Sequence, residues 1–255
     1  MQLYSKTDKV RELIRWITAP SFIALSVSEK RESLTEHLSR SIDAQVGFWG
    51  WGRGMPMDSG IAPIASILVG FTPEQKIGLH QMALSENTHE LLNVPVRELL
   101  RLDSHVSVTR SQFWTDEQWN RDERVKESFH RFGFDDWLVS VDYFREDTWN
   151  NLTFFRALGA PPFGEEEKQL VDLAMASISW LRPNVADIVP ASTFVDLSPR
   201  QRTVLMLLLE GLSRKQIAAN LEITLHTVND HCKELYTRFG VNSSSELSAR
   251  FLKSM

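Results

Sequence analysis

Cysteine is nearly absent from this chain of 255 residues, which contains only Cys232. A single cysteine excludes an intrachain disulfide and fits a reducing compartment. Long apolar runs are also missing: the longest, residues 61–71, contains a proline and is shorter than the ~20 residues that span a bilayer. The first residues lack the basic and then apolar pattern of a secretory signal. We therefore expect a cytoplasmic protein with no membrane partner.

Patterns typical of enzymes and metal sites are missing as well. The seven histidines are scattered, and none has zinc-type spacing to the cysteine or to a second histidine. There is no nucleophile elbow, and the glycine-rich segment at residues 49–54 lacks the Lys and Ser/Thr that end a phosphate-binding loop. We expect a protein that is not an enzyme, with no catalytic residue, no metal and no cofactor.

Charge is unevenly distributed along the chain, whose net charge is −5. Residues 197–255 contain eight Lys or Arg and five Asp or Glu, a net charge of +3, so the remainder has −8. A mildly basic tail on an acidic body is typical of a DNA-binding appendage on a separate domain.

The segment around residues 183–194 contains Pro183 and Pro190 and has no helical periodicity. Such a segment is typical of an interdomain linker. We therefore expect a first domain at residues 1–182, a linker at 183–194 and a second domain at 195–255.

The first domain shows both strand and helix patterns. Alternating or continuous apolar runs predict strands at residues 45–51, 64–71, 137–144 and 152–155, with residues 145–151 joining the last two. Apolar residues at helical spacing predict helices at residues 8–16, 29–42, 73–85, 116–131 and 165–181. The expected fold class is α+β, an antiparallel sheet with flanking helices.

The second domain has repeated signals for helix starts and ends. Three capping boxes begin helices, and a threonine begins another: Ser198 with Gln201, Ser213 with Gln216, Ser243 with Glu246, and Thr224. Gly211 and Gly240 end helices. In the third helix, Val228, His231, Leu235 and Phe239 form the expected inward face. Four short helices with a tight turn between the second and the third indicate an all-α helix-turn-helix domain.

The residues of this domain also resemble a known family. The matching segments are Leu197-Ser198-Pro199-Arg200-Gln201-Arg202, Val204-Leu205, Glu210-Gly211-Leu212-Ser213, Lys215-Gln216-Ile217-Ala218, Leu221 and Thr227-Val228-Asn229-Asp230-His231. They resemble the LuxR-type (GerE-like) helix-turn-helix of transcription regulators. The resemblance implies bacterial origin, binding of double-stranded DNA by the third helix in the major groove, and a homodimer formed largely through the fourth helix. The expected dimer residues are Leu247, Arg250 and Phe251.

Helical spacing then selects the side chains expected at DNA. His226, Asn229, Asp230 and Lys233 share the outward face of the third helix. Asn can bind adenine through two hydrogen bonds, Lys suits guanine or phosphate, and Asp can accept a hydrogen bond from cytosine. The remaining expected contacts are to phosphates, from Arg214, Lys215, Thr224, Thr227 and Arg238.

Three positions depart from the family pattern. The family usually has Glu where Gln201 stands, Gly where Glu222 stands, and often a basic residue where Asn229 stands. Acidic groups near DNA weaken the attraction to phosphates. The alternative function is therefore a protein-interaction or dimerisation module whose helix-turn-helix does not read DNA.

The first domain is expected to receive a signal, from a small-molecule effector or a protein partner. A receiver domain is excluded, because the chain begins without the acidic pair that such a domain needs. Asp103, Trp114 and Trp119 resemble the pattern of autoinducer-binding domains, with Ser104 in place of a proline. The order of the elements resembles a GAF domain or a PAS domain. The residues that bind a ligand stay unknown, and the eight tryptophans are either core or the lining of a pocket.

Overall fold

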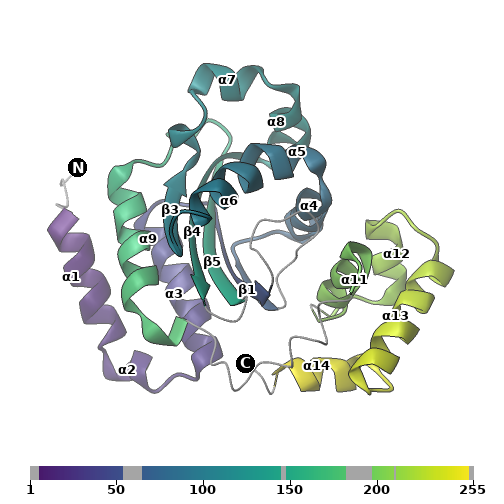
Figure 1. The fold of residues 1–255 in the computed structure, drawn as a ribbon. Coiled ribbons are helices and arrows are strands. Elements are labelled where there is room, and N and C mark those ends of the chain that lie inside the picture. The colour runs from purple at the N-terminus through teal and green to yellow at the C-terminus, as the bar shows by residue number, and fades with distance from the viewer. Residues whose placement is uncertain (1–5, 54–64, 145–147, 182–196, 210, 253–255) are drawn as a thin grey trace.

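The first domain is built on one antiparallel sheet. The computed structural model describes residues 6–53, 65–144, 148–181, 197–209 and 211–252 (Figure 1). The sheet has five strands in the order β2-β1-β5-β4-β3. They are β1 Val46–Arg53, β2 Ala65–Val69, β3 His105–Thr109, β4 Phe134–Phe144 and β5 Thr148–Ala157. The long β4 and β5 lie at the centre and pair along most of their length, with Trp137 opposite Phe155 and Tyr143 opposite Trp149.

Helices α3 Val27–Ser41 and α9 Glu165–Ser177 cover one face of the sheet, and α1 Lys6–Ile17 packs on the outer side of α9 (Figure 1). The short α2 Pro20–Ile23 follows α1, and the 3-10 turn η4 Ser179–Leu181 follows α9. Ser26 begins α3 with a capping box to Glu29, as a serine three residues before a glutamate predicts. The core on this face contains Leu34, Leu38, Trp49, Leu152 and Phe154, each fully buried.

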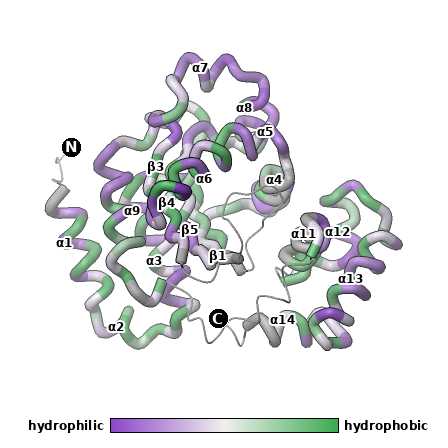
Figure 2. The backbone as a smooth tube through the Cα atoms, viewed as in Figure 1, coloured by the Kyte–Doolittle hydropathy of each residue, from purple (hydrophilic) through white to green (hydrophobic). Residues whose placement is uncertain are grey.

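Shorter helices cover the other face. They are α4 Pro73–Leu84, α5 Glu86–Thr88, the π-turn η1 His89–Asn93, α6 Val94–Leu100, the 3-10 turns η2 Arg110–Gln112 and η3 His130–Phe132, α7 Asp116–Arg121 and α8 Glu123–Ser128. α7 and α8 are largely hydrophilic (Figure 2). Under them lies the second core, with Leu91, Val96, Phe129, Trp137 and Val139 fully buried.

The α+β class and the antiparallel sheet are confirmed, and several elements differ from prediction. The edge strand β3 and the helical segments α2, α5, η1 and α6 were not expected. Residues 148–151, expected in a connection, lie in β5. The helix expected at residues 116–131 is interrupted because Asp122 has extended backbone and its carboxylate accepts a hydrogen bond from the Arg124 amide, beginning a new helix. The expected linker at residues 183–194 lies outside the described residues.

A histidine joins the edge of the sheet to α9. His105, at the start of β3, has Nδ1 2.5 Å from Asp142 Oδ1 of β4 and Nε2 3.0 Å from Asp172 Oδ1 of α9. Carboxylates only accept hydrogen bonds, so both ring nitrogens donate when the imidazole is protonated. The hydrogen bond to Asp142 accordingly raises the pKa of His105 above its ordinary value of 6.5. The protonated ring connects α9 to the sheet.

This arrangement predicts a pH-dependent stability. Because the folded-state pKa of His105 is raised, its contribution is complete below about pH 6.5 and is lost as the pH rises through the raised value. We expect His105→Gln to lower the free energy of unfolding more at about pH 5.5 than at about pH 8.5, as measured by urea denaturation. His226→Gln replaces a side chain that is 86% exposed, so it is the control and should change the free energy of unfolding little. An effect of His105→Gln that is equal at both pH values would contradict the assignment.

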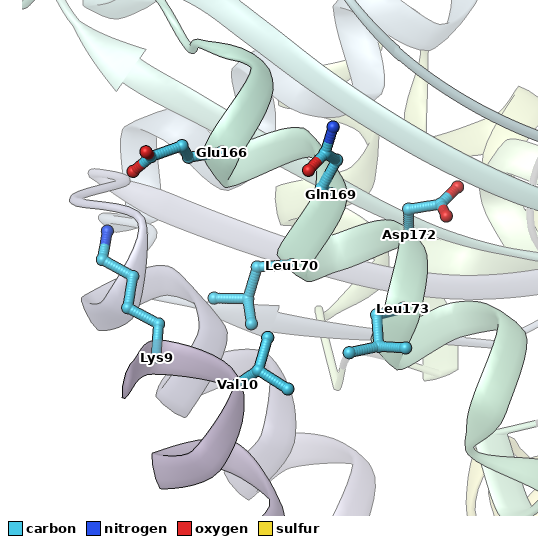
Figure 3. Close-up of a pocket in the computed structure, with 7 residues that line it drawn as sticks. All are labelled: Lys9, Val10, Glu166, Gln169, Leu170, Asp172 and Leu173. Carbon is cyan, nitrogen blue, oxygen red and sulfur yellow. The ribbon is translucent and has the colours of Figure 1, made fainter. Parts of the chain in front are cut away.

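Asp172 also borders a pocket between α1 and α9. The pocket has a volume of about 280 Å³. Its lining residues, drawn in Figure 3, are Lys9, Val10, Glu166, Gln169, Leu170, Asp172 and Leu173. The Asp172 carboxylate points away from the apolar side chains of Val10 and Leu173 (Figure 3), consistent with its hydrogen bond to His105. We assign no ligand to this pocket.

A buried ion pair lies at the opposite end of the same two strands. Arg110 Nε is 2.8 Å from Asp136 Oδ1, and both side chains are at most 5% exposed. The other carboxylate oxygen of Asp136 accepts a hydrogen bond from the Phe163 amide at 2.6 Å. Arg110 also pairs with Asp116 at 2.7 Å. These contacts join η2, β4 and the segment before α9.

Candidate nucleic-acid interface

Four helices form the C-terminal part of the protein (Figure 1). They are α11 Pro199–Leu209, α12 Arg214–Asn220, α13 Leu225–Phe239 and α14 Ser244–Leu252. α11 packs on the other three helices. Their shared core consists of apolar side chains that are at most 8% exposed: Leu197, Val204, Leu205, Leu207, Leu208, Ile217, Ala218, Leu221, Val228, Leu235, Phe239 and Leu247.

The starts and ends of these helices follow the sequence signals. Ser198 and Gln201 exchange the two hydrogen bonds of a capping box, at 2.7 and 3.2 Å. Ser213 and Gln216 form a second box. Gly211 and Gly240 have left-handed backbone, with φ of 84° and 61°, as a helix end requires.

Before α14 only half of the expected capping box forms. The Glu246 amide donates to Ser243 Oγ at 3.1 Å. The Glu246 carboxylate, however, accepts a hydrogen bond from the Asn242 amide at 2.9 Å rather than from the Ser243 amide. The carboxylate therefore satisfies a backbone donor one residue earlier than the pattern predicts.

The turn between α12 and α13 contains a strained residue. Glu222 has a φ of 53°, in the left-handed region that glycine adopts more readily. The Ile223 amide donates to the Ala218 carbonyl at 3.0 Å, and Thr224 Oγ1 accepts a hydrogen bond from the Thr227 amide at 3.1 Å and so begins α13. The conformation thus explains why glycine suits this position in the family pattern.

Replacing Glu222 tests that explanation. We expect Glu222→Gly to raise the free energy of unfolding by about 0.5 to 1 kcal/mol, because it removes the Cβ strain of about 1 to 2 kcal/mol at the cost of some chain entropy. Glu222→Ala removes the carboxylate but keeps the Cβ, so it serves as the matched control and should leave the stability nearly unchanged. Urea denaturation of both variants measures the difference. Equal stabilisation by Ala and Gly would assign the effect to charge instead.

The inward face of α13 is slightly rotated from the prediction. Val228, Leu235 and Phe239 are buried as expected, but His231 is only partly buried. Cys232 is fully buried in its place. Burial raises the pKa of the Cys232 thiol, which keeps the thiol protonated and unreactive.

The outward face of α13 has the four side chains that spacing predicts. His226 and Lys233 are exposed, and Asn229 and Asp230 are partly exposed. His226 Nε2 lies 3.5 Å from Asp230 Oδ2, and the His226 side chain is 86% exposed. The outward face of α13 therefore has hydrogen-bond acceptors, hydrogen-bond donors and the Lys233 cation.

Arg214, the first residue of α12, contacts this face directly. Its Nη1 donates to Asn229 Oδ1 at 2.9 Å. Its Nη2 lies 3.5 Å from the Tyr236 hydroxyl, and its guanidinium carbon lies 5.7 Å from the centre of the Tyr236 ring. The hydrogen bond to the Tyr236 hydroxyl raises the pKa of Arg214 above its ordinary value. The sequence predicted Arg214 as a phosphate contact and did not predict these two partners, which have no local spacing pattern.

The other expected phosphate contacts surround the outward face. Lys215 and Thr224 are exposed, and Thr227 and Arg238 are partly exposed. Thr224 and Thr227 bond each other through their hydroxyls at 2.8 Å. The side chains expected at DNA therefore come from the start of α12 and from α13.

Two further contacts connect the helices. Gln201 Nε2 donates to Glu234 Oε2 at 2.5 Å, and Arg200 Nη2 donates to the Leu221 carbonyl at 2.8 Å. A glutamate at position 201, as in the family pattern, would face Glu234 with like charge. The presence of Gln201, where the family usually has glutamate, therefore fits its hydrogen bond to Glu234.

The expected dimer residues lie in α14 and have different environments. Leu247 is fully buried inside the four-helix unit, so its side chain contributes to the unit's own core. Arg250 and Phe251 belong to α14, but their side chains are not among those that the structure describes. A dimer contact of α14 would therefore have to use residues other than Leu247 in this conformation.

The part of the chain that the structure describes contains no group of three or more His, Cys, Asp or Glu arranged to hold a metal ion. Among the same residues, no helix is both long and apolar enough to cross a bilayer.

Residues 195–251 match the model of the GerE family, described as bacterial regulatory proteins of the luxR family. Two curated proteins are similar in the same region. The response regulator Rre1 of Synechocystis sp. is 35% identical over 66 residues, which is 26% of this chain and 29% of that protein. The probable transcriptional regulator ycf29 of Cyanophora paradoxa is 38% identical over 53 residues, 21% of this chain and 25% of that protein. The chain thus matches less than a third of the length of either relative.

Solved structures similar to the whole chain include two of SdiA. Escherichia coli SdiA is 14% identical with a TM-score of 0.39, covering 97% of each chain. SdiA in complex with octanoyl-rac-glycerol is 15% identical with a TM-score of 0.37, covering 100% of this chain and 97% of the other. Residues 195–251 form a helix-turn-helix domain of the LuxR family.

Proposed function

We propose that the protein is a transcription regulator that binds double-stranded DNA through α13. The observation that supports this most is the outward face of α13, where Asn229, Asp230 and Lys233 are accessible within a domain of a regulatory family. A helix of this size fits the major groove, whose base edges offer hydrogen-bond donors and acceptors to such side chains. Arg214, Lys215, Thr224, Thr227 and Arg238 then contact phosphates, and His226 lies at the edge of the same face.

The electrostatics of this face favour binding as a dimer. Asp230 repels phosphates, and its nearest cation is His226 at 3.5 Å, which is charged only when protonated. One domain then binds weakly, and two domains on one DNA bind with an effective concentration that compensates. We propose a cytoplasmic homodimer that uses α14, including Arg250 and Phe251, with domains at residues 1–182 and 195–255.

Selection of DNA by the full-length protein at several salt concentrations tests the proposal. We expect enrichment of related DNA sequences and an affinity that falls steeply as the salt concentration rises. In a plot of log affinity against log salt concentration, each phosphate contacted adds about 0.9 to the steepness of the slope. A protein-interaction module would show neither enrichment nor a steep slope, and that result would remove the proposal. Analytical ultracentrifugation with and without the selected DNA would then measure the dimer.

We further propose that a small effector binds the first domain on the face covered by α4 to α8. Trp149 and Asn151 of β5 point to this face and are each 4% exposed. Within the described residues, Trp149 Nε1 and Asn151 Oδ1 have no hydrogen-bond partner. Buried polar atoms are nearly always paired, so two unpaired atoms on neighbouring positions support a missing polar ligand.

The strand beside them leaves room for these side chains. A Cβ on Gly52 would lie 2.4 Å from the Trp149 ring, and one on Gly50 would lie 2.9 Å from Asn151 Oδ1. A ligand that fits must accept a hydrogen bond from the indole and donate one to the amide oxygen. A small apolar molecule with a carbonyl next to an N–H or O–H group has both. The GAF-like or PAS-like assignment of this domain stays a prediction.

Mass spectrometry of small molecules released from the purified protein tests this site. We expect a bound molecule from the wild type and much less from Trp149→Phe, which loses the indole donor but keeps the apolar ring. Trp180→Phe, on the other side of the sheet, is the control and should release as much as the wild type. Equal release by all three proteins would place the ligand elsewhere, and no release would remove the effector proposal. An effector that binds one dimer arrangement better would change DNA affinity by linkage.

A further inference from the structure

The amide of Asn229 has a defined orientation. Arg214 Nη1 donates to it at 2.9 Å across the turn that separates α12 from α13. A guanidinium has only donors, so its partner must be the amide oxygen and not the amide nitrogen. Both hydrogens on Asn229 Nδ2 therefore remain for another partner, together with the second lone pair of Oδ1, which lies beside the guanidinium.

The guanidinium itself is supported from α13. It lies against Tyr236, with Nη2 3.5 Å from the hydroxyl and the guanidinium carbon 5.7 Å from the ring centre. Tyr236 is only 9% exposed, so it is a stable base for this contact. Arg214 is consequently held between two residues of α13 that are seven positions, or two turns, apart.

This orientation changes what Asn229 can read. Binding adenine through two hydrogen bonds requires the amide oxygen to accept from N6 while the nitrogen donates to N7. Arg214 takes one of the two lone pairs of that oxygen, and its positive guanidinium beside the oxygen opposes the approach of a second donor such as adenine N6. Guanine presents two neighbouring acceptors, N7 and O6, which suit an amide that keeps its oxygen toward Arg214 and donates to the base.

We propose that Arg214 is a positioning residue that makes Asn229 select guanine rather than adenine. The proposal rests on the proposed function, because it concerns the base that α13 reads. The guanidinium has five donors, so its bond to Asn229 leaves others for phosphate. A phosphate role and a positioning role are thus compatible, and base preference separates them, since a phosphate contact carries no sequence information.

Selection from a random DNA library by the full-length protein tests the proposal, using five proteins. Asn229→Ala identifies the base pair that Asn229 reads, because preference is lost there. At that position we expect the wild type to prefer guanine over adenine by about tenfold, which is near the lower limit for a base contact. Arg214→Met frees the oxygen and should move the preference to adenine. Asn229→Asp retains a partner for Arg214 but has no N–H, so it should lose the guanine preference.

Lys215→Met is the matched control, since Lys215 is the next exposed cation on α12. This variant should reduce the slope of log affinity against log salt concentration by about 0.9, and its base preference should stay the same. Thermal unfolding checks that Arg214→Met, an exposed substitution, leaves the fold intact. Adenine at the Asn229 position in the wild type, or an Arg214→Met variant with unchanged preference, would overturn the proposal while leaving DNA binding in place. Absence of specific binding by the wild type would remove the proposed function as well.

Discussion

Asn229→Ala combined with Lys233→Ala is expected to lower the affinity for the selected DNA about 100-fold. Each side chain lies on the accessible face of α13, and each base contact contributes about 1 to 3 kcal/mol, or roughly fivefold to somewhat more than 100-fold. Neither side chain belongs to the buried core of the domain, so the free energy of unfolding should change little. Fluorescence anisotropy with the selected DNA measures the affinity, and urea denaturation measures the stability.

Two further measurements are needed to interpret the affinity of this double variant. Thr237→Ala, an exposed substitution near the end of α13, is the control and should bind as the wild type does. Binding to unrelated DNA at low salt should fall much less than binding to the selected site, because phosphate contacts remain. An unchanged site preference in the double variant would mean that another face of the domain meets the bases.

Arg110→Met is expected to lower the free energy of unfolding by about 3 to 5 kcal/mol, because it leaves the buried Asp136 carboxylate without its cation. The Met side chain keeps most of the apolar packing, so charge dominates the loss. Burial already raises the pKa of Asp136. Removal of Arg110 raises it further, so protonation relieves the unpaired charge as the pH falls. The loss should therefore be smaller at about pH 5 than at about pH 7.

Urea denaturation at both pH values checks this prediction. Arg121→Met is the control: Arg121 pairs with Glu117 at 2.6 Å, but its side chain is 79% exposed. Exposed pairs contribute about 0 to 1 kcal/mol, so this variant should resemble the wild type. A similar loss for both variants would mean that burial of the Arg110–Asp136 pair has no special effect.

Sequence patterns predicted most of the central architecture. The strands β1, β2 and β4 and the helices α1, α3, α4 and α9 were expected at nearly their observed positions, and β5 was expected only at residues 152–155. The edge strand β3 was missed although Val106 and Val108 alternate with polar residues, because two apolar positions are too few to distinguish a short strand from a loop. The break at Asp122 was missed because an aspartate inside a helical pattern can also face solvent, and only its bond to the Arg124 amide decides between the two.

The candidate site was predicted in its location but not in its internal contacts. The spacing of His226, Asn229, Asp230 and Lys233 identified the accessible face of α13. The partners of Arg214 were not predicted, because Asn229 is 15 positions away and lies on another helix. Glu222 was marked by its departure from the family pattern, and its φ of 53° gives the physical meaning of that departure.

The helix-turn-helix unit was determined by its sequence alone to an unusual degree, because caps and helix-ending glycines are hydrogen bonds and dihedral preferences within four residues. The relation between distant segments was decided only by the tertiary structure. It places Arg214 on Asn229, His105 between Asp142 and Asp172, and Trp149 over Gly52. Each of these contacts depends on which elements lie side by side, and no local pattern of residues encodes that.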